Sequence, residues 1–83
     1  MRVRYTAEAQ ADLAAIYKYL DERSPQAALR TKATIQQVIA GLADFPDVGP
    51  ASDINGVRVL LAGRLPYRIF YRHLAEEIQN FAH

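Results

Sequence analysis

Apolar and charged residues alternate along residues 64–72, which read Arg-Leu-Pro-Tyr-Arg-Ile-Phe-Tyr-Arg. A period of two is typical of a half-buried strand, because successive side chains leave opposite faces of the pleat. We therefore expect a central strand here, with one set of side chains in the core and the other on an outer face. The two sets are Tyr67, Ile69 and Tyr71 toward the core, and Arg68, Phe70 and Arg72 on the outer face.

Residues 57–61 predict a second strand next to it, because the run is apolar and β-branched. The same alternation predicts that Val57, Val59 and Leu61 face the core. Arg58 and Leu60 would then join the outer face. The two neighbouring strands would share one basic surface.

Two helices are predicted before these strands. Apolar residues recur at helical spacing along residues 7–22 and again along residues 25–44. Thr6 is placed to cap the first helix, and Ser24 to cap the second, with Pro25 at the first helical position, where proline is tolerated. The second helix ends at Phe45-Pro46, because a residue before proline is disfavoured in the α region. The two apolar stripes are Ala9, Leu13, Ile16, Tyr17 and Leu20, and Ala28, Thr31, Ile35, Val38, Ile39 and Leu42.

The short link between the helices predicts an antiparallel hairpin. Gly41 interrupts the second helix near its end, and close packing there would explain the glycine. Residues 2–5 and 77–81 predict a first and a last strand, and residues 47–56 are rich in turn residues. The predicted fold class is α+β in the order β-α-α-β-β-β, an antiparallel sheet with the helical hairpin packed on one face.

Composition limits the class of protein. The chain has 83 residues, 51% of them hydrophobic and 23% charged, which predicts one globular domain over residues 1–83. It has no cysteine, so neither disulfides nor thiolate metal sites are available, and we expect no cofactor and no metal. No apolar run approaches the ~20 residues that span a bilayer. We expect a cytoplasmic protein with no membrane partner.

Charge is unevenly distributed although the net charge is only +1. Residues 57–73 contain four arginines and no acid. Such an excess can meet an anionic partner, either nucleic acid or an acidic protein segment, and it can equally be the solvated face of a sheet.

These residues together resemble the RelE/ParE superfamily of bacterial toxins, also called plasmid stabilisation proteins, and more closely its ParE branch. No single motif is specific, but their order and spacing cover nearly the whole chain. The matching segments are Ala9-x-x-Asp12-Leu13-x-x-Ile16-x-x-Tyr19-Leu20, Ser24-Pro25-x-Ala27-Ala28, Leu42-x-x-Phe45-Pro46-x-x-Gly49 and Pro66-Tyr67-Arg68-Ile69-Phe70-Tyr71-Arg72.

The resemblance implies a toxin of a type II toxin-antitoxin system. ParE-like members act on DNA gyrase, trapping it on cleaved DNA without being enzymes, and a ParD-like ribbon-helix-helix antitoxin silences them in a hetero-oligomer. RelE-like members instead cleave messenger RNA in the ribosome. We expect the partner-binding residues on the basic sheet face and its surroundings. They are Arg58, Leu60, Arg64, Arg68, Phe70, Arg72 and Phe81.

Cleavage of RNA needs a base and an acid besides cations, and arginine supplies only the cation. By parity His73 falls on the covered face or in a turn, away from the arginines, and His83 is the last residue. RelE-like nucleases resemble one another in lysines near the start of the sheet, whereas this chain has none after Lys32. We therefore expect no catalytic residue and a gyrase inhibitor, with RNA cleavage as the alternative.

The last strand departs from the family pattern, which usually continues with apolar residues and a short basic tail. Alternation predicts Asn80 beside Ile78 and Ala82 on the inner side, where an unpaired amide costs about 1–3 kcal/mol. One hypothesis is that this end is altered, which would make the chain an inactive relative that still binds antitoxin.

Overall fold

Residues 1–82, which the computed structural model describes, form the six elements predicted, in the predicted order. They are β1 (Arg2–Tyr5), α1 (Ala7–Arg23), α2 (Pro25–Asp44), β2 (Arg58–Leu61), β3 (Arg68–His73) and β4 (Glu77–Ala82). Each predicted boundary is within a few residues of the observed one. The largest difference is at the central strand, where regular pairing begins at Arg68 and residues 64–67 belong to the preceding turn.

Both helices begin at the predicted caps. The Thr6 hydroxyl accepts a hydrogen bond from the Ala9 N–H at 3.1 Å, and the Ser24 hydroxyl accepts one from the Ala27 N–H at 3.2 Å. Pro25 occupies the start of α2, where a missing N–H leaves no helical bond unmade. Within residues 1–82 neither helix has the length and apolar character that crossing a membrane requires.

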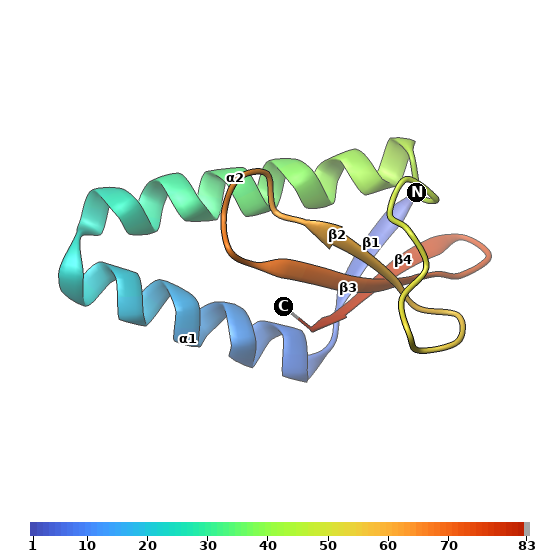
Figure 1. Cartoon of the computed structure of the whole chain (residues 1–83), viewed down its shortest axis with the longest axis horizontal. Coiled ribbons are helices and arrows are strands. Elements are labelled where there is room, and N and C mark those ends of the chain that lie inside the picture. The colour runs from blue at the N-terminus through green and yellow to red at the C-terminus, as the bar shows by residue number, and fades with distance from the viewer. Residues whose placement is uncertain (83) are drawn as a thin grey trace.

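The four strands lie in the order β1-β4-β3-β2. The pairs β2–β3 and β3–β4 are antiparallel, as predicted, but β1 pairs with β4 in parallel, so the sheet is mixed. The helical hairpin brings the chain back to the end of the sheet at which β1 begins (Figure 1), and β2 therefore runs in the same direction as β1. Two further reversals give β4 that direction too.

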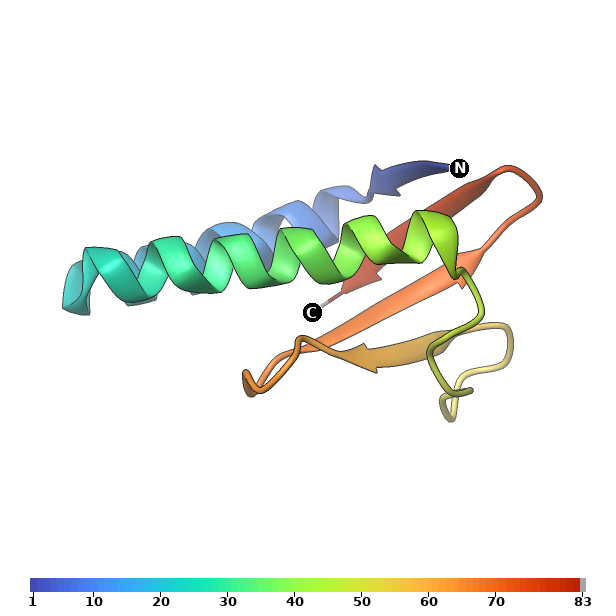
Figure 2. The same ribbon diagram turned by 90° about the horizontal axis from the view of Figure 1, so that it is seen from above.

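The helical hairpin covers one face of the sheet. Figure 1 and Figure 2 show α1 and α2 running next to each other, with their connection extending past the sheet. Side chains of α2 and of the inner sheet face meet in one core. It contains Ile35, Ile39, Leu42, Ala62, Ile69, Tyr71 and Ile78.

Alternation along β3 is confirmed. Ile69 and Tyr71 are fully buried, whereas Arg68 is exposed and Phe70 and Arg72 are half-buried on the opposite face. Tyr67 packs against the core as expected. The inner face of this strand therefore holds the sheet to the helices, and its outer face is available to a partner.

The predicted orientation is wrong for β2 (Arg58–Leu61), although Val57, just before the strand, is buried as expected. In the observed register Leu60 lies opposite Ile69 and packs against the core, whereas Leu61 lies opposite Arg68 and is 60% exposed. Opposite residues of an antiparallel pair share a face, so Arg58 and Leu60 lie on the inner side and Val59 and Leu61 on the outer side. The sequence favoured the opposite orientation, because Val57, Val59 and Leu61 are all apolar whereas the alternative set contains Arg58. In the structure β2 is an edge strand, on which Leu60 packs against the core and Arg58 donates hydrogen bonds to the carbonyls of the loop before it.

Asn80 lies on the inner side of β4, as predicted, and is fully buried. The pairing of β3 and β4 shifts between Phe70 and Tyr71, and at this point the Asn80 amide Nδ2–H donates to the Phe70 carbonyl at 3.2 Å. Its Oδ1 atom is the one buried side-chain oxygen or nitrogen within residues 1–82 that has no hydrogen-bond partner. The buried amide expected to be unpaired therefore has a partner for its N–H group but none for its oxygen.

Candidate functional site: a basic sheet face and a clamped loop

The face of the sheet opposite the helices is the first candidate site, and we refer to it as the outer face. Strand register and alternation define it. It comprises Arg2 and Arg4 of β1, Glu77, Gln79 and Phe81 of β4, Arg68, Phe70 and Arg72 of β3, and Val59 and Leu61 of β2. Four guanidiniums thus share this surface with one carboxylate among the described strand residues.

The carboxylate of Glu77 lies at one border of the outer face. Its Oε2 atom is 3.5 Å from Arg2 Nη2 and 3.3 Å from Arg4 Nε, and the side chain is 20% exposed. Arg72 lies over the ring of Phe81, 4.8 Å from its centroid. The ring orients that guanidinium by a cation–π contact and leaves its edge available for hydrogen bonds.

A hollow opens on the outer face where β2 and β3 meet the loop before them. Its volume is about 390 Å³, within the range of small-molecule sites. Val59 and Phe70 supply apolar wall, Arg68 supplies a cation, and the loop adds Ala51, Ser52, Asp53 and Ile54.

The structure brings together four of the predicted partner-binding residues: Arg68, Phe70, Arg72 and Phe81 share the outer face. Arg64 is exposed in the turn before β3. Arg58 and Leu60 lie on the inner side, for the reason given above. Sequence reasoning missed Arg2, Arg4, Val59 and Leu61, although the alternation of Val3 and Tyr5 with Arg2 and Arg4 was a usable signal.

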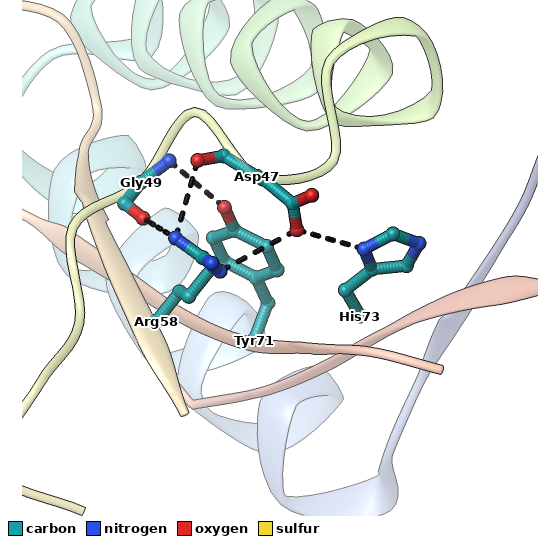
Figure 3. A network of polar contacts seen from close by, with 5 residues as sticks. All are labelled: Asp47, Gly49, Arg58, Tyr71 and His73. Carbon is teal, nitrogen blue, oxygen red and sulfur yellow. Dashed lines mark hydrogen bonds and ion pairs between the residues drawn. The ribbon is translucent and has the colours of Figure 1, made fainter. Parts of the chain in front are cut away.

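The second candidate site is a network that holds the loop after α2 against the sheet, and we refer to it as the loop clamp (Figure 3). It consists of Asp47, Gly49, Arg58, Tyr71 and His73. The Gly49 N–H donates to the buried Tyr71 hydroxyl at 3.0 Å. Arg58 Nη1 donates to the backbone carbonyls of Asp47 at 3.2 Å and Gly49 at 2.8 Å.

The Asp47 carboxylate contacts two side chains of the loop clamp. Its Oδ1 atom is 2.8 Å from His73 Nδ1 and 3.5 Å from Arg58 Nε. The hydrogen bond from His73 has the largest effect and lowers the pKa of Asp47 below its ordinary value. Desolvation opposes it, and the charges of His73 and Arg58 lower the pKa further. A carboxylate only accepts hydrogen bonds, so His73 Nδ1 carries the proton in this contact.

The prediction that His73 lies away from the arginines holds for Arg68 and Arg72, which leave the other face of β3, but it is wrong for Arg58. His73 has the predicted parity, opposite the buried Ile78, but it shares the Asp47 carboxylate with Arg58. No sequence signal links these positions, because 26 residues separate Asp47 from His73. The prediction for His83 lies outside the described residues.

Acid is expected to weaken the loop clamp. Because the folded-state pKa of Asp47 is lowered, its ionised form stabilises the fold above the unfolded-state pKa near 3.8, and this contribution is lost as the pH falls through the folded-state pKa. Urea unfolding of the wild type and of Asp47→Asn should therefore show the variant less stable at neutral pH. The difference should narrow below about pH 4. A gap that is constant from pH 7 to pH 2 would contradict this assignment.

No group of three or more acidic, histidine or cysteine side chains suited to a metal ion occurs within residues 1–82. Both candidate sites therefore rest on guanidiniums, aromatic rings and one exposed histidine–carboxylate pair. Such surfaces can bind anions and proteins directly.

A similar solved structure identifies the class of protein. A chain of the chromosomal ParDE TA system from P. aeruginosa superposes with a TM-score of 0.86 and is 30% identical, over 99% of this chain and 91% of that one. The fold is thus that of a toxin of the RelE/ParE superfamily. The candidate toxin Y4kP of Sinorhizobium fredii is 35% identical over 71 residues, which are 86% of this chain and 74% of that protein.

The family follows from the profile described as "ParE toxin of type II toxin-antitoxin system, parDE", which matches residues 3–82. The chain belongs to the ParE toxin family of type II toxin-antitoxin systems. The resemblance found in the sequence is confirmed.

Proposed function

We propose that this chain inhibits DNA gyrase and is held inactive by a ParD-like antitoxin of the ribbon-helix-helix type. The observation that carries the proposal is the match to the ParE family along residues 3–82, supported by the likeness to the P. aeruginosa ParDE system. A gyrase inhibitor needs a surface that holds its target and no chemistry of its own. The outer face fits that requirement.

Proton transfer has little support on the outer face. Its guanidiniums stay protonated, and Glu77 is engaged by Arg2 and Arg4. The aromatic residues there are phenylalanines, which carry no titratable group. A surface of this kind binds and positions a partner.

One observation favours the alternative, ribosome-dependent cleavage of messenger RNA. The loop clamp places His73 and Arg58 around one carboxylate, so an acid–base group and a cation do lie close together. However, Arg58 is already bound to the carbonyls of Asp47 and Gly49, and it links the loop to β2. The network therefore acts first as a structural support for the loop.

Two assays on the purified protein separate these functions. We expect inhibition of gyrase supercoiling with accumulation of cleaved DNA, and intact ribosome-bound message. If the alternative were correct, message would be cut, and His73→Gln would slow the cutting by about 10²–10⁴. A protein inactive in both assays that still binds antitoxin would be the inactive relative considered above.

The antitoxin is proposed to bind the outer face through acidic and apolar side chains that meet Arg68, Phe70, Arg72 and Phe81. Reversal of both arginines, Arg68→Glu with Arg72→Glu, should raise the Kd for antitoxin roughly thirtyfold or more, because like charges at an interface cost several kcal/mol. Titration calorimetry at low salt measures this effect. Arg68→Lys with Arg72→Lys is the matched control and should retain most of the affinity. Unchanged affinity of the glutamate variant would refute the assignment.

A further inference from the structure

Three guanidiniums of the outer face, those of Arg4, Arg68 and Arg72, are regularly spaced. Gln79 of β4 pairs with Arg4 of β1 on one side and with Arg72 of β3 on the other. The three side chains therefore form one row across the sheet. Strands are spaced about 4.8 Å apart, which places the two arginines of this row about 10 Å from each other. Arg68 lies four residues before Arg72 on the same face of β3, about 13 Å away.

Two phenyl rings lie next to these cations. Phe81 lies beneath the Arg72 guanidinium, and Phe70 follows Arg68 by two residues on the same face. Both rings are half-buried, so the sheet holds each one in place while part of it reaches the surface. Alternating guanidiniums and rings on a strand surface are the features that hold unstacked nucleotides.

The hollow beside Phe70 decides between a nucleic acid and an acidic peptide. Its 390 Å³ can admit a base against Phe70 and Val59, with a phosphate on Arg68 at the border. Asp53 also lines it. A carboxylate there repels phosphates and acidic side chains alike, but it can accept a hydrogen bond from the amino group of a base. The side chains of aspartate and glutamate offer no such donor when ionised. The lining thus favours a nucleotide.

We infer that the outer face binds single-stranded nucleic acid, with phosphates on Arg4, Arg68 and Arg72 and one base in the hollow beside Phe70. Single strands are required because the rings and the hollow contact base faces that a duplex keeps stacked. The antitoxin proposed above would occupy the same face, so the two ligands would exclude each other. The inference goes beyond gyrase inhibition and does not depend on it.

Fluorescence anisotropy of a labelled 20-nucleotide single strand, titrated with the free protein, tests the phosphate contacts. Three contacts predict that the logarithm of the association constant falls with the logarithm of salt concentration at a slope of about −2. Arg4→Gln with Arg72→Gln should weaken binding about sixtyfold at 0.05 M salt and reduce the slope by about 1.4. Lys18→Gln with Arg30→Gln removes two charges from the helices and should have little effect.

The base contacts have their own test. Phe70→Leu should weaken binding of the normal strand about tenfold but leave an abasic strand of the same length unaffected. Oligo(dC) should bind more tightly than oligo(dT), which lacks the amino group, and Asp53→Ala should remove the difference. Thermal unfolding of each variant checks that it folds.

Equal effects of the outer-face and helical charge variants would overturn the inference. So would equal binding of normal and abasic strands together with no effect of Phe70→Leu, which would leave the outer face as an anion surface suited to an acidic protein. Gyrase is absent from these assays. Their failure therefore leaves the proposed function standing, and failure of gyrase inhibition leaves this inference standing.

Discussion

Replacement of Gly49 by alanine is expected to lower the free energy of unfolding by about 2 kcal/mol, and the melting temperature by about 10 °C, because the new methyl group has no room. A Cβ atom at this position would lie 2.8 Å from the Tyr71 hydroxyl oxygen and 3.0 Å from the Val59 carbonyl oxygen. Real Cβ atoms essentially never approach other atoms as closely as the first of these distances. Thermal and urea unfolding of Gly49→Ala measure the loss.

Neither neighbour can move cheaply. Tyr71 is fully buried in the core, and its hydroxyl accepts the Gly49 N–H. The Val59 oxygen belongs to the backbone of β2. The Val59 N–H donates to the Pro50 carbonyl at 3.0 Å, which also holds this residue in place. Strain at Gly49 would therefore displace the loop, and with it one wall of the hollow on the outer face.

Gly41→Ala is the matched control for this prediction. Apart from the adjacent residues and backbone of α2 itself, no atom of residues 1–82 lies within 4 Å of the Cβ that alanine would add there, so the close packing suggested by the sequence is wrong. Alanine is a better helix former than glycine by about 1 kcal/mol, and Gly41→Ala should therefore stabilise the protein. Opposite signs for the two glycines are the expected result. A Gly49→Ala variant as stable as the wild type would contradict the role assigned to the loop clamp.

Local sequence signals predicted the elements well, because caps and periodicity act over a few residues. Thr6 and Ser24 identified both helix starts, and the buried residues of α2 are those of the predicted stripe, with Val38 packed at its edge. The parallel partner of β1 was not predicted. It depends on where the chain returns after the hairpin, which periodicity does not encode.

The candidate sites show the same limit. Alternation in β3 placed Arg68, Phe70 and Arg72 correctly, whereas the orientation of β2 depended on whether Leu60 or Val59 would reach the helices. Both sets of side chains were apolar enough to be inside. The loop clamp joins residues 22 and 26 positions apart, and the turn signals around Gly49 gave no indication of a tyrosine partner.

Asn80 is the position where one substitution should have the largest effect of all. Asn80→Asp would place a carboxylate in a fully buried site, 3.2 Å from the Phe70 carbonyl that the amide now satisfies. An uncompensated buried charge costs about 3–5 kcal/mol, so the variant should be largely unfolded or strongly destabilised at pH 7. Burial raises the folded-state pKa of such a carboxyl, and the loss should therefore shrink as the pH falls toward the unfolded-state value near 4.

Asn80→Leu is the control for the charge, because it removes the amide without adding a carboxylate. Leucine removes the unpaired Oδ1 atom and adds apolar burial, but it also removes the hydrogen bond to Phe70. These effects oppose each other, and we expect stability within about 1 kcal/mol of the wild type. Urea unfolding at pH 7 and pH 4 compares the two variants. If leucine were as destabilising as aspartate, the hydrogen bond from the Asn80 amide to the Phe70 carbonyl would be what fixes the shifted register of β3 and β4.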